Sequence, residues 1–262
     1  MTRLSKFLRR GFGIAIILIV GAAGAFAPWL GTVDPNASSS DILAASSAAH
    51  WLGTDELGRD IYSRVLYGAR ISLIIGPAAA LVALAIGAPI GLVAGYSRGK
   101  IDMLLVQGID VFIAMPGLII ALMITVMVGA TAQNLVLVLG FVMWPEMARI
   151  VRSLVLGLRD VFFVEAARSM GCSVFQLLTI HILPNIMRTI AAQFAILVSS
   201  AIFTAASLGF LGLGLPPPAA DWGTMVQTGF DYLSLNPLLS LAPGTAVAFT
   251  VLGFYLIGQA VD

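Results

Sequence analysis

The sequence predicts an all-α, polytopic membrane protein with six transmembrane helices. Hydrophobic residues make up 59% of the 262 residues, charged residues make up only 10%, and the mean hydropathy is +1.00. Soluble domains carry about 25% charged residues, so this composition excludes a soluble globular enzyme. Long charge-free stretches recur along the chain, without the short alternating segments that are typical of a transmembrane β-barrel.

Each expected span is long enough for a bilayer core, which takes about 20 helical residues to cross. We expect spans near 11–33, 71–97, 103–128, 135–156, 189–220 and 232–261. The polar segment 129–134 separates the third span from the fourth, and Pro116 and Pro145 predict a kink in each of them.

The first span could instead be a signal peptide, because Ala25-Phe26-Ala27 resembles a cleavage site. Its uncharged stretch, 11–33, is long for a signal peptide, and five more spans follow. We therefore expect a retained first helix.

The basic residues predict the orientation, because Lys and Arg are enriched in cytoplasmic loops. With the N-terminus inside, only Arg59, Arg64 and Arg70 lie outside. The other basic residues lie inside: Arg3, Lys6, Arg9, Arg10, Arg98, Lys100, Arg149, Arg152, Arg159, Arg168 and Arg188. Both termini are expected in the cytoplasm.

Two external segments follow from this topology. In 34–70, a polar loop leads to apolar residues at helical spacing (Leu57, Ile61, Val65), which predicts an amphipathic surface helix capped by Thr54 or Asp55. The chain then divides into 1–33 (cytoplasmic N-terminus and first helix), 34–70 (external loop) and 71–262 (five-helix core).

The second external segment, 211–238, is predicted to be stiff but not helical because of its prolines at 216–218. Asp221 and Trp222 follow these prolines. An exposed Trp beside an acid suits the docking of a partner protein. The alternative is a re-entrant plug that closes the pore from above.

The longest cytoplasmic segment, about 157–183, carries the clearest functional pattern. It predicts a short helix with Glu165-Ala166-Ala167-Arg168, a break at Gly171, a second short helix, and Pro184 opening the next membrane helix. Ala166 and Ala167 leave a low surface between two opposite charges, which another protein can grip.

This segment resembles the cytoplasmic loop of permease subunits in bacterial ATP-binding-cassette importers. The ending His181-Ile182-Leu183-Pro184-Asn185 is similar to the dipeptide, oligopeptide and nickel branch. Three further stretches agree with that branch: 50–60 (HWLGTDELGRD), 67–73 (YGARISL), and 207–214 (SLGFLGLG) with Trp222-Gly223. The motif order is that of the second permease subunit, and the resemblance covers about 50–262. Arg188 departs from it, because the branch is apolar there.

The resemblance implies a type I importer permease (MetI-like) fold in a bacterial inner membrane. It implies three kinds of partner: a homologous second permease subunit, two cytoplasmic ATPase subunits and an extracytoplasmic substrate-binding protein. Glu165, Ala166, Ala167, Arg168 and Gly171 would couple this chain to the ATPases. The chain lacks the phosphate-binding motif Gly-x-x-x-x-Gly-Lys-Ser/Thr, so ATP and Mg²⁺ are expected on the ATPase subunits, with no cofactor bound here and no nucleic acid.

Two residues inside the spans, Asp110 and Arg188, are candidates for functional membrane charges. We expect Asp110 to pair with Arg149 or Arg188 rather than to contact the solute. One cysteine and two histidines give no basis for a metal site.

The leading interpretation is a peptide-importer permease. A permease for nickel or a metal chelate is the alternative within the family. A secondary transporter is disfavoured by the lack of an internal repeat and by the short chain, and a membrane scaffold would leave the projecting loop without a purpose.

Overall fold

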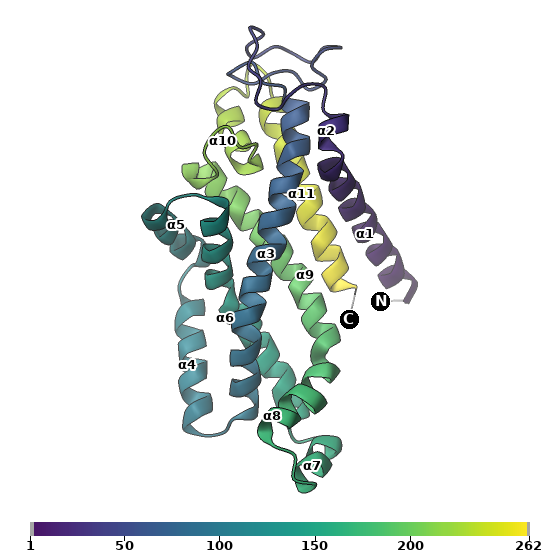
Figure 1. Cartoon of the computed structure of the whole chain (residues 1–262), viewed down its shortest axis with the longest axis vertical. Coiled ribbons are helices and arrows are strands. Elements are labelled where there is room, and N and C mark those ends of the chain that lie inside the picture. The colour runs from purple at the N-terminus through teal and green to yellow at the C-terminus, as the bar shows by residue number, and fades with distance from the viewer. Residues whose placement is uncertain (1–2, 261–262) are drawn as a thin grey trace.

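A computed structural model of the chain describes residues 3–260, and every regular element in that range is helical. Figure 1 shows an elongated bundle with the loops of 31–60 at one end and α7 at the other. The elements run α1 (Arg3–Ala25), α2 (Ala27–Leu30), α3 (Ile61–Tyr96), α4 (Lys100–Ala114), α5 (Gly117–Val128), α6 (Ala132–Leu158), α7 (Phe162–Ser169), α8 (Val174–Gln176), the π-helix η1 (Leu177–Ile182), α9 (Leu183–Leu208), the π-helix η2 (Gly209–Leu213), α10 (Trp222–Asp231) and α11 (Leu238–Gln259). The all-α prediction is confirmed.

Within residues 3–260, five helices are long and apolar enough to cross a membrane, and a sixth span is present if α4 and α5 count as one. These two helices meet at an angle of 82°. Pro116 lies between them and has no N–H to continue the ladder, so the predicted kink is a full break. Pro145 lies inside α6, which continues through it as one helix.

The centre of the bundle is the long contact between α3 and α6. Gly87, Gly91 and Gly95 recur every fourth residue of α3 and face α6. A Cβ atom on Gly91 would lie 2.5 Å from the carbonyl oxygen of Ala148. Small residues at this spacing let the two backbones approach closely.

The amphipathic helix predicted from Thr54 is not a separate element. The helix begins at Ile61 and continues into the membrane span, with Asp60 at its N-cap accepting a hydrogen bond from the Ser63 amide at 2.8 Å. At 36 residues, α3 is about 54 Å long, far more than a bilayer core of about 30 Å. The predicted surface helix is the projecting end of this span.

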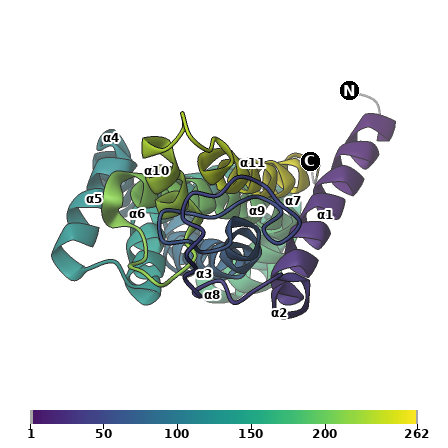
Figure 2. The same cartoon turned by 90° about the horizontal axis from the view of Figure 1, so that it is seen from above.

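Segment 211–238 was expected to be non-helical, and that prediction is wrong. Its middle forms α10, 10 residues long, and Asp221 caps the helix by accepting a hydrogen bond from the Gly223 amide. The element packs against α11 and η2 of its own bundle. Seen from above in Figure 2, α10 lies beside the loops that cover α3, and α1 lies at the edge.

Candidate functional site

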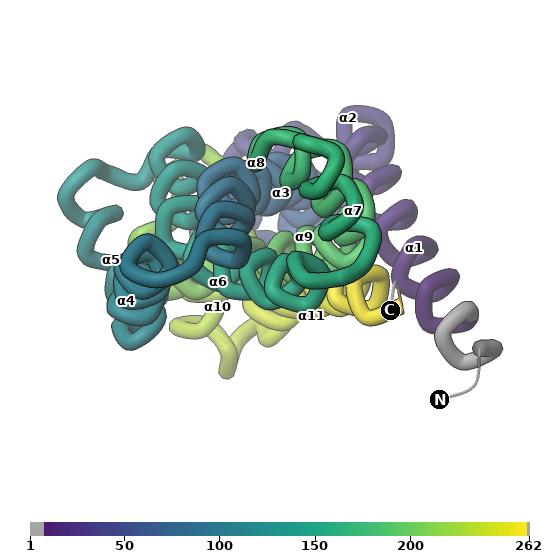
Figure 3. The backbone as a smooth tube through the Cα atoms, turned by 90° about the horizontal axis from the view of Figure 1, so that it is seen from below, coloured from purple at the N-terminus to yellow at the C-terminus, as the bar shows by residue number. Residues whose placement is uncertain are grey.

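The predicted cytoplasmic loop forms a compact projection at one end of the bundle. Figure 3 looks onto this end and shows α7 and α8 in front of α3 and α9. The predicted short helix is α7, with Glu165 and Ala166 exposed on its surface.

One face of α7 is fixed to the bundle. Val164 and Ala167 are buried and belong to the main hydrophobic core together with Leu177 and Ile182 of η1. Ala167 is 1% exposed, so it cannot contribute to an outward surface as the sequence suggested. Of the two alanines, only Ala166 faces outward.

Arg168 also turns toward the bundle. Its guanidinium lies 5.6 Å from the centroid of the Tyr96 ring at the end of α3, and it donates a hydrogen bond to the Arg159 carbonyl at 3.3 Å. Cation–π contacts of this kind contribute about 0.5–1 kcal/mol at exposed sites. Arg168 therefore links α7 to the ends of α3 and α6, and Glu165 is the exposed charge beside Ala166.

The chain leaves α7 through a Schellman motif. The Gly171 amide donates to the Arg168 carbonyl at 3.0 Å, and the Cys172 amide donates to the Ala167 carbonyl at 3.1 Å. Gly171 has φ +88°, a left-handed conformation that costs other residues about 1 kcal/mol or more. This geometry confirms the predicted break at Gly171.

After the break the chain enters α9 without interruption. Ser173 and Gln176 form a capping box at the start of α8, and η1 joins α8 to α9. Pro184 lies in the first turn of α9, as predicted, although η1 leads into this helix without a break. Because α7 packs on η1, a force on α7 passes directly to a membrane-spanning helix.

The outer surface of this projection is unusually apolar. Phe162 is 89% exposed, Met170 78% and Phe175 73%. Neighbouring exposed apolar side chains at a polar end of a membrane protein are typical of a surface that a partner protein covers.

Asp110 and Arg188 are the two candidate charges inside the membrane spans. Asp110 accepts a hydrogen bond from Arg149 at 2.7 Å, which confirms one of the two pairings expected. Arg188 is exposed, and no ion pair reaches it within the described part of the chain. The two candidates are not brought together.

Of the two alternatives for Trp222, exposure for docking is wrong, whereas packing of its segment on its own bundle agrees with the structure. The side chain is 1% exposed and donates a hydrogen bond from Nε1 to the Val65 carbonyl at 2.9 Å. It lies against Gly68, where a Cβ atom would come within 2.4 Å of the indole. The ring closes the contact between α3 and α10.

Asp221 holds the start of α10 in place through its side-chain hydrogen bonds. Its carboxylate accepts hydrogen bonds from the amides of Leu215 and Gly223 and from the Thr224 hydroxyl. Burial raises the pKa of Asp221 above its ordinary value, against the opposing effect of these hydrogen bonds.

The opposite end holds a polar network whose roles the sequence did not indicate. Asp60 is fully buried and accepts hydrogen bonds from Thr32 and Ser63, with the His50 ring nitrogen 2.9 Å away. Burial alone would raise the pKa of Asp60, but these hydrogen bonds outweigh it and lower the pKa. His50 and Asp60 are the two ends of the 50–60 stretch that carries the family resemblance, but that stretch gave no indication that they pair.

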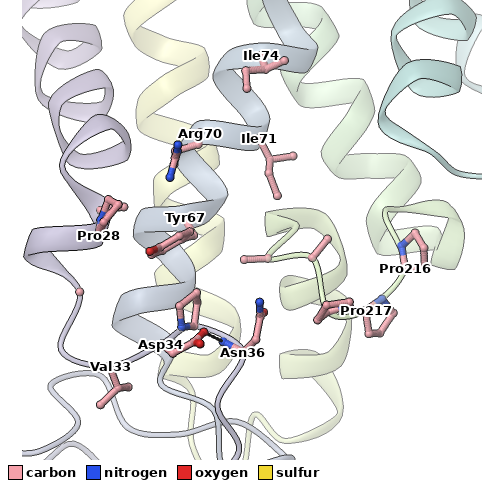
Figure 4. A pocket seen from close by; sticks show the side chains of 16 residues that line it. Pro28, Val33, Asp34, Asn36, Tyr67, Arg70, Ile71, Ile74, Pro216 and Pro217 are labelled. Atoms are coloured by element: carbon pink, nitrogen blue, oxygen red, sulfur yellow. Dashed lines mark hydrogen bonds between the residues drawn. The ribbon is translucent and has the colours of Figure 1, made fainter.

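A cleft of about 1020 Å³ opens beside this network. Figure 4 shows Tyr67, Arg70, Ile71 and Ile74 of α3 on one wall. The remaining lining comes from residues within 27–36 and from 216–220. Within residues 3–260, no group of three metal-ligating side chains comes together.

The comparisons with known proteins agree on the type of protein. Residues 87–262 match the family described as "Binding-protein-dependent transport system inner membrane component". The chain is 38% identical over 259 residues to the glutathione transport system permease protein GsiD of Pectobacterium atrosepticum, covering 97% of this chain and 86% of that protein.

Two peptide permeases are similarly close. The identity is 38% with the dipeptide transport system permease protein DppC of Alkalihalophilus pseudofirmus, over 94% of this chain and 82% of that protein. It is 36% with the oligopeptide transport system permease protein OppC of Bacillus subtilis, over 94% and 81%.

Among solved structures, an inward-facing form of the MetNI methionine ABC transporter matches with a TM-score of 0.60 and 21% identity, over 76% of this chain and 96% of that chain. This likeness supports the fold. The chain belongs to the family of inner-membrane permease components of binding-protein-dependent ATP-binding-cassette importers.

Proposed function

We propose that this chain is one of two permease subunits in an importer for short peptides, and that α7 couples it to an ATPase subunit. The observation that carries the coupling is the projection itself: a short helix with Glu165 and Ala166 exposed, an apolar surround, and a buried face packed on η1. The peptide class is supported by the names of the relatives, which transport dipeptides, oligopeptides and glutathione.

In this proposal, two ATPase subunits bind ATP and Mg²⁺ and close on each other during the cycle. Each permease subunit inserts its projecting helix into one ATPase. Closure draws α7 inward, η1 passes the displacement to α9, and the membrane helices move between inward-open and outward-open states as rigid bodies. A binding protein delivers the peptide from outside, and both termini of this chain lie in the cytoplasm.

Glu165→Lys tests the coupling. The carboxylate is exposed, so reversing its charge leaves the α7 fold intact and disturbs only the surface that faces the ATPase. We expect the ATPase subunit to co-purify about tenfold less well, as for a lost charge-assisted contact at an interface.

The matched control is Asp231→Lys, an exposed acid at the end of α10 on the other side of the molecule. It should leave ATPase association unchanged. Normal ATPase association in both variants, with uptake of radiolabelled dialanine at the wild-type rate, would show that the coupling surface has been misassigned. A wild-type complex that takes up no dialanine would contradict the peptide class instead.

A further inference from the structure

A cavity of about 350 Å³ lies at the break between α4 and α5, enclosed by α6 and α9. Its walls are aromatic and aliphatic, with Phe112, Leu118 and Phe203 among them. One charged side chain lines it, Glu146 of α6, and two hydroxyl residues of α9 accompany it, Ser200 and Thr204. In Figure 1 this region lies between α5 and α6, well away from α7.

Glu146 is an exposed carboxylate in the middle of a membrane-spanning helix, and no ion pair reaches it among the side chains that the structure describes, those of residues 8–260. Arg149, one turn further along α6, pairs with Asp110 at 2.7 Å. Counted as ionised groups, Asp110, Glu146 and Arg149 sum to a charge of −1. A carboxylate that faces lipid is costly, so this face of α6 meets an aqueous path or another protein.

The backbone around the cavity adds further acceptors. Pro116 has no N–H, so the Phe112 carbonyl accepts only a long hydrogen bond from the Met115 amide at 3.3 Å, at the negative end of the α4 dipole. Pro145 likewise cannot donate to the Phe141 carbonyl. Broken helices whose free carbonyls meet in a cavity are typical of cation-binding sites in transporters.

We infer that Glu146 and the break between α4 and α5 form a subsite for the protonated amine of the transported solute. The apolar walls fit an organic ammonium group better than a metal ion, which would need several ligating side chains. Phe112 and Phe203 are the aromatic residues that line the cavity. The inference rests on the proposed function in one respect: it assumes that this cavity lies along the solute path.

A labelling experiment tests the subsite without knowing the solute. Ser200→Cys is introduced together with Cys172→Ser, which removes the native cysteine, and the whole reconstituted importer is treated with charged thiol reagents. The measured quantity is the ratio of two labelling rates of the thiol at position 200. It is the rate with a cationic reagent (2-aminoethyl methanethiosulfonate) divided by the rate with an anionic one (2-sulfonatoethyl methanethiosulfonate). Glu146→Gln should lower this ratio about tenfold, because a nearby carboxylate in a partly desolvated cavity attracts cations.

Glu146→Asp keeps the charge and should keep most of the preference. Asp41→Asn, at an exposed carboxylate in the 31–60 loops, should change nothing. An unchanged ratio in Glu146→Gln, or a thiol at 200 that stays unreactive with and without ATP, would overturn the subsite. Loss of the second permease subunit from the Glu146→Gln complex would also overturn it, because Glu146 would then be a subunit contact.

The same complexes separate this inference from the proposed function. Dialanine uptake by the wild type tests the peptide class, whereas the reagent ratio tests the subsite directly. A wild-type importer without dialanine uptake but with a Glu146-dependent ratio would place an amine subsite in an importer of another solute class.

Discussion

Trp222 shows at the scale of single residues how a side chain that looks functional can be structural. The indole fills the space above Gly68 and bonds to the Val65 carbonyl. Trp222→Ala should lower the free energy of unfolding by roughly 3–5 kcal/mol, as for other large buried aromatic side chains. Thermal unfolding of the purified permease complex measures this.

Trp29→Ala is the control, because Trp29 is 77% exposed. Its unfolding midpoint should stay close to the wild-type value. Equal midpoints for the wild type and Trp222→Ala would mean that the α3–α10 contact contributes little to stability.

The Asp60 carboxylate makes the folding stability of the protein depend on pH in the acid range. Its hydrogen bonds hold the pKa below the unfolded-state value of about 3.9. A depressed carboxyl pKa contributes stability that is fully present above the unfolded-state pKa and is lost as the pH falls through the folded-state pKa. We expect wild-type stability to fall below about pH 4, and Asp60→Asn to be less stable at pH 6 with a shallower decline. Parallel declines in both proteins would show that Asp60 is not responsible.

At the scale of elements, Gly171 decides how α7 is held. Gly171→Ala should weaken the Schellman motif by about 1 kcal/mol, because alanine resists the left-handed conformation, and should slow uptake by displacing α7. Gly157→Ala in α6 is the matched control: both glycines have open space around them, but only Gly171 has a positive φ. Equal uptake in the two variants would contradict the role of this turn.

Pro116 decides the shape of the third span. Spin labels at Leu104 and Val126, both exposed, should lie about 25 Å apart across the 82° bend and about 33 Å apart in a straight helix. Pro116→Ala should shift the measured distance toward the longer value. Pro145→Ala, in a helix that is already continuous, should shift nothing. A bend that survives Pro116→Ala would be imposed by packing alone.

The sequence predicts these elements to different degrees. The break at Pro116 and the turn at Gly171 follow from backbone chemistry that two residues carry by themselves. Trp222, Asp60 and α10 depend on partners far along the chain: the indole needs Gly68, and Asp60 needs Thr32 and His50. Ala166 and Ala167 are neighbouring residues of the same type, so the sequence does not distinguish them. The packing of α7 on η1 buries Ala167 and leaves Ala166 exposed.

At the scale of the whole molecule, the membrane fold was predictable because several stretches of the chain are apolar over a length that spans a bilayer as a helix. The start of α3 was not predictable from periodicity, because Leu57, Ile61 and Val65 fit helical spacing although Leu57 precedes the helix. The irregular backbone of 54–60 is held by the local Arg59–Asp55 pair at 2.7 Å and by contacts from the preceding loop, such as the Ser39 hydroxyl donating to the Gly58 carbonyl at 2.8 Å.

The central claim is that α7 is the contact with the ATPase. A photoreactive benzophenone attached at Ala166→Cys, in the Cys172→Ser background, tests it in the assembled importer. We expect a covalent product with the ATPase subunit from Ala166→Cys, and none from Met127→Cys, which is 84% exposed at the far end of α5. No ATPase product from Ala166→Cys in an importer that retains dialanine uptake would contradict the account.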